Sequence, residues 1–257
     1  MNSRDHQWLN HACCLGALAL LSLCLAPSLQ ARLDAQLSLS NDYRYRGLDQ
    51  SDHGMVVQGS IDYSSSHDWY VGVWASTVGY DFQGDDRSLE VDYYAGFVHR
   101  FSNPLAVDVS VIRYTYPGSH TRLDYDWTEL QLSAFIGDRW TATYAIGDNW
   151  LGRDENSGHL EMGFRQALPL HLVWDITLGH TFSERVLGME YQSIETGLAR
   201  QFGPLLLRLS YTNVDRKMRQ RLGTNLDRSW LFALRWDLGQ SLRTAGRSAN
   251  ARRSRMD

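Results

Sequence analysis

Residues 33–76 read LDAQLSLSNDYRYRGLDQSDHGMVVQGSIDYSSSHDWYVGVWAS, and this stretch decides the fold. From residue 33 to residue 46 the odd positions are apolar and the even positions polar, with Asn41 as the exception. Successive side chains of a strand point to opposite faces, so this period of two predicts one strand between an oily medium and water. Its length exceeds the roughly 9–11 residues that a tilted strand needs to cross a bilayer. We therefore expect a membrane-spanning strand with Tyr43 and Tyr45 facing lipid.

The same alternation recurs along the rest of the chain and predicts an all-β protein of about twelve strands. Valine, leucine and aromatic residues alternate with charged and hydroxyl residues in each segment. We expect strands at residues 33–46, 55–63, 69–76, 89–98, 105–116, 127–136, 140–147, 159–165, 171–179, 192–199, 205–212 and 230–238.

The connections between these strands alternate in length. Short turns follow the even-numbered strands, as in SSSHD at 64–68 and GDR at 137–139, while long polar segments rich in Gly or Asp follow the odd-numbered ones. Outer-membrane barrels combine an even number of antiparallel strands, short periplasmic turns and long external loops. The sequence thus predicts a single antiparallel transmembrane β-barrel, residues 32–240, in the bacterial outer membrane.

The two ends of the chain differ from this central part. Residues 1–31 contain an apolar run from Ala12 to Ala26 followed by small residues, which is typical of a signal peptide. All three cysteines lie within it, so we expect a mature chain without disulfides or cysteine-based zinc sites. Residues 241–257 carry five arginines and few apolar residues, which indicates a basic, disordered tail. We expect no nucleic-acid partner for an exported protein.

Five motifs in the first half of this region resemble those of a known family. NDYRYRGLDQSDHGMVVQGSIDY from residue 41, DWYVGVWAS from 68, LEVDYYAGF from 89, YTYPG from 114 and DWTEL from 126 occur in this order. They resemble the successive motifs of the TorF family of porins, which are proteobacterial outer-membrane proteins. Asp49 and Met55 depart from the residues usual in that family. The resemblance implies a barrel with a pore, and it implies no particular solute.

The opening motif supplies the candidate site residues. A hairpin that keeps its polar faces together sets Arg44 opposite Gln58, Asp42 opposite Ser60 and Ser40 opposite Asp62. We therefore expect the pore wall to include charged and amide side chains that face one another: Asp42, Arg44, Arg46, Gln58, Asp62, Glu90, Asp92 and Glu129. Guanidinium groups facing carboxylates across a narrow pore can select solutes by charge. The same charges can also simply solvate and cross-link the wall, and the two roles are compatible.

Other site chemistry has weaker support in the sequence. The histidines after residue 31 lack metal-binding spacing, and Asp85–Asp86 or Asp124–Asp126 are more simply solvated loop acids than Ca²⁺ ligands. Ser157 and His159 share one strand face, as in a membrane-embedded hydrolase, but no G-x-S-x-G elbow accompanies them. We expect neither an enzyme nor a bound metal or cofactor.

The sequence thus favours a porin-like channel for passive diffusion of small polar solutes. Twelve strands lie between small filled barrels and large open porins, so we expect a narrow pore. Because acids outnumber bases on the predicted strands, we also expect a weak preference for cations. The expected partners are outer-membrane lipid, small polar solutes and, during biogenesis, the barrel assembly machinery. A non-conducting structural or adhesive barrel is the alternative, and the oligomeric state stays open.

Overall fold

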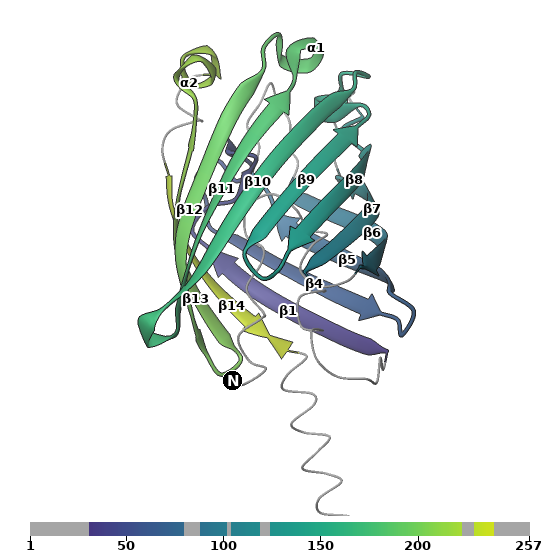
Figure 1. Ribbon diagram of the computed structural model, residues 1–257. Coiled ribbons are helices and arrows are strands. Elements are labelled where there is room, and N and C mark those ends of the chain that lie inside the picture. Colours follow the sequence, from purple (N-terminus) through teal and green to yellow (C-terminus); the bar gives the residue numbers. More distant parts are fainter. Residues whose placement is uncertain (1–30, 80–87, 102–103, 119–123, 223–228, 239–257) are drawn as a thin grey trace, which may run out of the picture.

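The computed structural model describes residues 31–79, 88–101, 104–118, 124–222 and 229–238. Twelve antiparallel strands form a closed barrel, with β1 paired to both β4 and β14 (Figure 1). The barrel strands are β1 (Arg32–Ser40), β4 (Val56–Ser64), β5 (Trp69–Thr77), β6 (Leu89–Arg100), β7 (Leu105–Thr115), β8 (Trp127–Ile136), β9 (Trp140–Gly147), β10 (Ser157–Leu168), β11 (Leu172–Phe182), β12 (Tyr191–Phe202), β13 (Leu205–Val214) and β14 (Ser229–Asp237). The predicted fold class and strand number are confirmed.

The connections sort by length between the two ends of the barrel, as predicted. The short helices α1 (Glu184–Leu187) and α2 (Arg216–Leu222) lie at the end with the long connections (Figure 1). The 3₁₀ turn η1 (Trp150–Gly152) belongs to another long connection, and η2 (Pro169–His171) makes a tight turn between β10 and β11. By analogy with outer-membrane barrels, the end that carries α1 and α2 is the external end.

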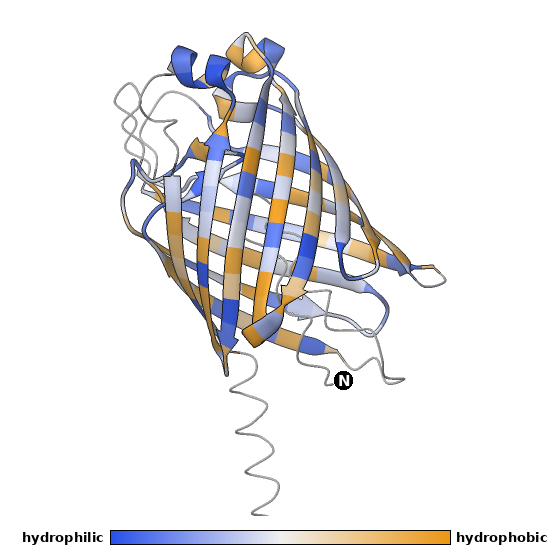
Figure 2. Ribbon diagram, turned by 60° about the vertical axis from the view of Figure 1, so that its left-hand side comes forward, coloured by the Kyte–Doolittle hydropathy of each residue, from blue (hydrophilic) through white to orange (hydrophobic). Residues whose placement is uncertain are grey.

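Each strand has an apolar outer face and a polar inner face. Leu130, Leu132 and Phe232 expose about half of their surface, whereas Glu129, Gln131 and Ser133 on the opposite face of β8 are buried. Figure 2 shows the resulting alternation of hydrophobic and hydrophilic residues along the strands. An apolar exterior around a polar interior is the arrangement of a transmembrane barrel, and the chain is a protein of the bacterial outer membrane.

Outward-facing aromatic side chains lie near both ends of the strands. Tyr211 and Trp230 contact each other with ring centroids 5.2 Å apart near the external end. Tyr63 and Trp69 form a similar pair, 5.4 Å apart, beside a short turn at the other end. Tyr and Trp prefer the level of the lipid headgroups, so these pairs mark the two membrane interfaces.

The described residues contain no helix that is long and apolar enough to cross a membrane. The predicted signal peptide at residues 1–31 lies almost entirely outside the described residues, as do the tail at residues 241–257 and the loop acids Asp85 and Asp86.

The first strand is shorter than predicted. It ends at Ser40 rather than at Arg46, and it pairs with β4 so that Ser38 lies opposite Gln58 and Asp34 opposite Asp62. The predicted pairing of Arg44 with Gln58 was wrong, because the residue opposite Gln58 is Ser38, six positions earlier in the chain. Residues 41–55 leave the barrel wall and contain the small two-stranded sheet of β2 (Arg44–Tyr45) and β3 (Leu48–Asp49).

Candidate functional site

Asn41 marks the point at which the chain leaves the barrel wall. Its side-chain Nδ2 donates to the backbone oxygen of Trp230 at 3.0 Å, and its Oδ1 accepts from the backbone N–H of Phe232 at 2.6 Å. The amide side chain therefore occupies hydrogen-bonding positions on β14 that a longer β1 would have used. The backbone after residue 41 is thereby free to turn inward.

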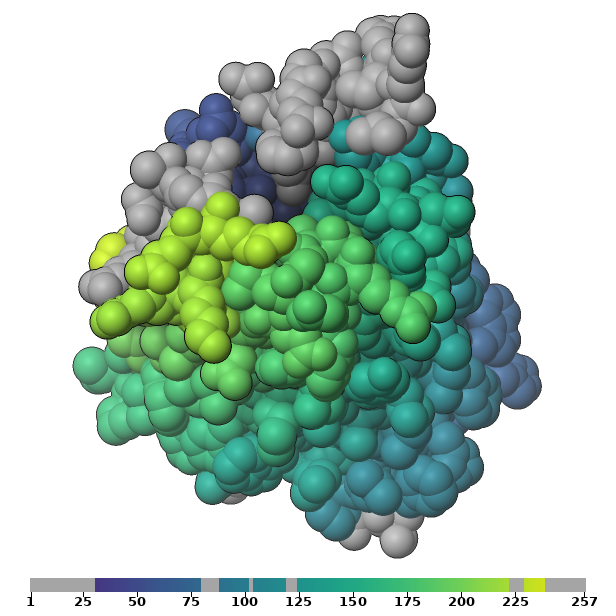
Figure 3. Space-filling model, turned by 90° about the horizontal axis from the view of Figure 1, so that it is seen from above, coloured from purple at the N-terminus to yellow at the C-terminus, as the bar shows by residue number. Residues whose placement is uncertain are grey.

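Residues 41–54, here called the inner hairpin, fold into the barrel. β2 and β3 pair Tyr45 with Leu48, and Arg46 and Gly47 between them both have positive φ, of 52° and 80°. Positive φ at both central residues is the signature of a type I′ hairpin turn. In the view from the external end, Figure 3 shows a hollow with purple atoms of the early part of the chain at its floor.

The inner hairpin packs tightly against the wall at Gly47. A Cβ at this position would lie 2.4 Å from Cγ1 of Val214 on β13 and 3.3 Å from Cβ of Ser193 on β12. Only glycine satisfies both this close approach and the positive φ.

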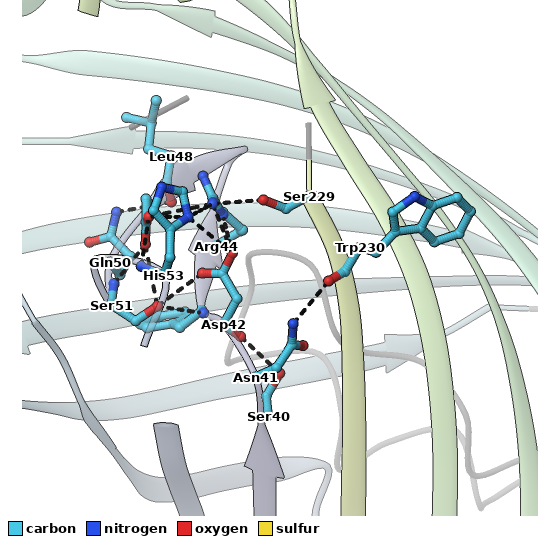
Figure 4. A network of polar contacts seen from close by, with 12 residues as sticks. Ser40, Asn41, Asp42, Arg44, Leu48, Gln50, Ser51, His53, Ser229 and Trp230 are labelled. Atoms are coloured by element: carbon cyan, nitrogen blue, oxygen red, sulfur yellow. Dashed lines mark hydrogen bonds and ion pairs between the residues drawn. The ribbon is translucent and has the colours of Figure 1, made fainter. Parts of the chain in front are cut away.

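A polar network holds the base of the inner hairpin together (Figure 4). Arg44 donates to Asp42 at 2.8 Å and to the hydroxyl of Ser229 on β14 at 2.7 Å. Its Nη2 lies 2.8 Å from Nδ1 of His53 and 3.4 Å from Oδ2 of Asp49. The hydroxyl of Ser51 donates to Asp42 at 2.9 Å. The network therefore ties the hairpin to itself and to the wall.

Asp42, Asp49 and His53 form the one group of potential metal ligands in the described part of the chain, with ligand atoms within 4.8 Å of one another. The guanidinium group of Arg44 already contacts all three. Burial raises the pKa of Asp49, while the backbone N–H of Ser51 and the charge of Arg44 act in the opposite direction. The chain itself thus supplies a positive charge to this cluster.

Arg46, at the tip of the inner hairpin, makes an ion pair with the wall. Its Nη2 donates to Oε2 of Glu129 on β8 at 2.6 Å, and both side chains are almost completely buried. The guanidinium carbon lies 4.7 Å from the ring centroid of Tyr45, within the range of a cation–π contact. Gln131 also donates to Glu129, at 2.6 Å. Arg46 therefore fastens the tip of the hairpin to β8.

The predicted orientation of Tyr43 and Tyr45 was wrong. Both are buried inside the barrel, where Tyr43 contacts Trp74 and Tyr45 contacts Tyr114 and Trp127. The cause is the turn after Asn41, because residues beyond it no longer follow the in–out alternation of a wall strand. For the same reason Asp42, Arg44 and Arg46 lie on the inner hairpin instead of the wall.

The other predicted site residues do lie on the inner face of the wall. Gln58 lies between Ser38 and Ser76, each 3.3 Å away. Asp62 accepts from Ser60 at 2.8 Å and from the hydroxyl of Tyr94. Their part in solute selection, like that of the other predicted residues, stays a prediction.

Glu90 and Asp92 are neighbours on the inner face of β6. Glu90 accepts from the hydroxyl of Tyr116 at 2.9 Å. Asp92 is fully buried, and in the described part of the chain neither of its oxygens has a hydrogen-bond partner. Glu90 and Glu129 lie near enough to interact electrostatically with it. These carboxylates concentrate negative charge beside the inner hairpin.

An aromatic pocket lies between the inner hairpin and the wall strands β6 to β8. Its lining includes Tyr45, Leu48 and Gln50 from the hairpin and Glu90 from the wall. The remaining lining residues are mostly aromatic: Tyr114, Tyr116, Tyr125, Trp127, Trp150 and Leu151. The rings of Tyr114 and Trp127 stack with centroids 4.1 Å apart and planes 5° apart.

Sequence reasoning missed a pairing of tyrosines with glycines on the inner wall. Tyr70 lies opposite Gly96, and Tyr94 opposite Gly72, on β5 and β6. A Cβ on either glycine would lie 2.4 Å from the facing ring, so each ring lies flat over its glycine. The hydroxyl of Tyr70 thereby reaches Asp108 on β7, at 3.0 and 3.1 Å from its two oxygens. The repeated Tyr-x-Gly spacing in the two strands is the signal that could have found this pairing.

A charged cluster lies on the inner face of β11, β12 and β13. Arg208 on β13 donates to both oxygens of Asp175 on β11, at 2.5 and 2.7 Å, and to Glu195 on β12 at 3.0 Å. Its guanidinium group passes over Gly197, where a Cβ would lie 2.7 Å from Nη2. This cluster cross-links three strands.

Ser157 and His159 are both buried on β10 but are not hydrogen-bonded to each other. Nδ1 of His159 is 2.9 Å from the hydroxyl of Thr181, and its Nε2 is 3.6 Å from Glu161. The hydroxyl of Ser157 has no hydrogen-bond partner among the described residues. The two residues therefore do not form a serine–histidine pair in this structure.

A family model described as "Bacterial protein of unknown function (Gcw_chp)" matches residues 26–236. No curated protein matches the chain in sequence. Among solved structures, the KdgM porin in complex with disordered oligogalacturonate matches with a TM-score of 0.50 and 7% identity, over 80% of this chain and 98% of that chain. The outer membrane protein Omp33 of Acinetobacter baumannii gives a TM-score of 0.46 at 7% identity over 81% and 98%. The COG4313 outer membrane channel from Pseudomonas putida F1 gives 0.45 at 12% identity over 82% and 96%. At these identities the likeness concerns the fold.

Proposed function

The chain belongs to the Gcw_chp family, and from the interior of its barrel we propose that it is an outer-membrane channel for passive diffusion of small polar solutes. The observation that carries this proposal is the distribution of charged side chains on the inner wall. Carboxylates and guanidinium groups point inward from β6, β7, β8, β11, β12 and β13. Burying so many charges in a dry core would be costly, so we propose that water enters the barrel along a narrow path.

The inner hairpin makes the path narrow. Arg46 fastens its tip to β8, and Arg44 fastens its base to β14. Twelve strands enclose a space between that of small filled barrels and that of large open porins. We propose that the path beside the hairpin admits only ions and small polar molecules, and that release of the hairpin would widen it.

The charges inside the barrel favour cations. The inward acids include Asp62, Glu90, Asp92, Asp108, Glu129, Asp175 and Glu195, while inward arginines are fewer and contact these acids in part. A pore lined by excess negative charge raises the local concentration of cations. We propose a weak cation preference set by Asp42, Arg44, Arg46, Gln58, Asp62, Glu90, Asp92 and Glu129, in addition to their structural contacts.

The motif resemblance to the TorF family of porins supports the same proposal. We also propose that the chain is a member of the TorF family. We further propose that the barrel assembly machinery inserts the chain into the outer membrane. No catalytic role is proposed, since Ser157 and His159 are not hydrogen-bonded to each other and Nδ1 of His159 contacts Thr181 instead.

Planar-bilayer recording and liposome swelling test the channel. Purified folded protein, verified by heat-modifiable gel mobility, should give discrete conductance steps and admit small polar solutes while excluding large ones. Complete absence of both signals from folded protein would favour the structural or adhesive barrel. Esterase activity that disappears in Ser157→Ala would instead support the hydrolase.

A further inference from the structure

The aromatic pocket beside the inner hairpin combines two features that recognise cations. Six aromatic rings contribute to its lining, and Glu90 supplies a carboxylate that is 2% exposed. Aromatic faces attract cations electrostatically, and organic ammonium groups are typical ligands of aromatic cages. A carboxylate in the same enclosed space adds a charged hydrogen-bond acceptor.

Arg46 shows how this region already holds a cation. Its guanidinium group contacts the Tyr45 ring and donates to Glu129 at the same time. The pocket, which Tyr45 also lines, offers the same pair of elements, with the rings of Tyr114 and Trp127 and the carboxylate of Glu90. The structure therefore contains two ring-plus-carboxylate environments that share Tyr45, one at Arg46 and Glu129 and one in the pocket.

A second observation, separate from the pocket lining, is the buried carboxylate of Asp92. It is fully buried one step along β6 from Glu90 on the same inner face, and directly opposite Tyr114 of the pocket lining. Neither of its oxygens has a hydrogen-bond partner among the described residues. A buried carboxylate without such partners is costly, and a nearby positive charge would offset that cost.

We propose that the aromatic pocket binds a small organic ammonium ion, with the rings contacting its alkyl groups and Glu90 and Asp92 compensating its charge. This inference rests on the proposed channel function in one respect: if the barrel conducts, small organic cations are a class of its solutes. The site itself is a binding site whether or not the barrel conducts.

The test is an equilibrium titration of folded protein in detergent with methylammonium chloride, with ionic strength kept constant by sodium chloride. Trp127 and Trp150 line the pocket, so tryptophan fluorescence should change and saturate. Glu90→Gln and Asp92→Asn should each weaken binding about tenfold or more, because each removes a charged partner. Asp108→Asn is the matched control, since Asp108 is an equally buried inner-wall carboxylate that Tyr70 already satisfies; it should bind as the parent does.

Three results would overturn the inference: no saturable response to methylammonium, equal binding by both carboxylate variants and the parent, or saturation by glucose alone, which would indicate a neutral-sugar site. Bilayer recording separates this inference from the proposed function. A protein that conducts but does not bind methylammonium refutes the site alone, whereas one that binds without conducting refutes the channel alone.

Discussion

Replacing Arg46 with Met should release the inner hairpin from the barrel wall. The substitution keeps an unbranched side chain but leaves Glu129, which is 1% exposed, without its ion-pair partner. Removing one partner of a buried pair costs about 3–5 kcal/mol. Gln131 and Tyr114 still donate to Glu129, so we expect the lower end, about 3 kcal/mol. If this cost falls on the docked hairpin alone, the undocked fraction should rise about a hundredfold.

Cysteine labelling measures that fraction directly. Residues 32–257 contain no cysteine, so in protein produced without residues 1–31 Leu48→Cys is the single thiol, at a buried position on β3. In the Arg46→Met background the maleimide labelling rate of this thiol should rise by about two orders of magnitude, and single-channel conductance should increase.

The control is Arg100→Met. Arg100 pairs with Asp68 beside a short turn, and the two side chains are 28% and 34% exposed, so losing this pair should cost at most about 1 kcal/mol and leave labelling unchanged. A labelling rate in Arg46→Met within about threefold of the parent would refute the idea that this ion pair holds the hairpin.

Three further changes probe other parts of the barrel. Gly47→Ala should raise the same labelling rate about fivefold or more, whereas Gly118→Ala, also at positive φ but with no atom near its Cβ, should not. Tyr70→Phe leaves the buried Asp108 carboxylate without its hydroxyl donor and should lower the unfolding free energy in urea by about 1–3 kcal/mol; an unchanged midpoint would contradict this role. Leu132→Arg puts a charge on the lipid face near mid-strand and should cost about 2–4 kcal/mol in vesicle folding, and a cost near zero would mean that this face does not meet lipid.

The period of two sufficed to predict the barrel because it reports a physical boundary. Each strand separates lipid from the interior, and a one-residue slip would turn every apolar side chain to the wrong side. The pattern of short turns and long loops added the orientation of the strands. These features are local in the sequence, so both strand number and inner face could be predicted without tertiary information.

The inner hairpin could not be predicted in the same way. Residues 42–46 continue the alternation of β1, and only Asn41 interrupts it. That one polar residue at an outward position is the signal, because its side chain takes over hydrogen bonds on β14. Where the released segment then goes depends on distant partners, such as Glu129 on β8 and Val214 on β13, which no local pattern reveals.

Single-channel recording in a salt gradient tests the central claim most directly. Folded protein in a planar bilayer should give discrete conductance steps with a reversal potential of the sign expected for a weak cation preference. The absence of conductance from verified folded protein would contradict the channel, and a reversal potential of the opposite sign would contradict the role assigned to the inner carboxylates.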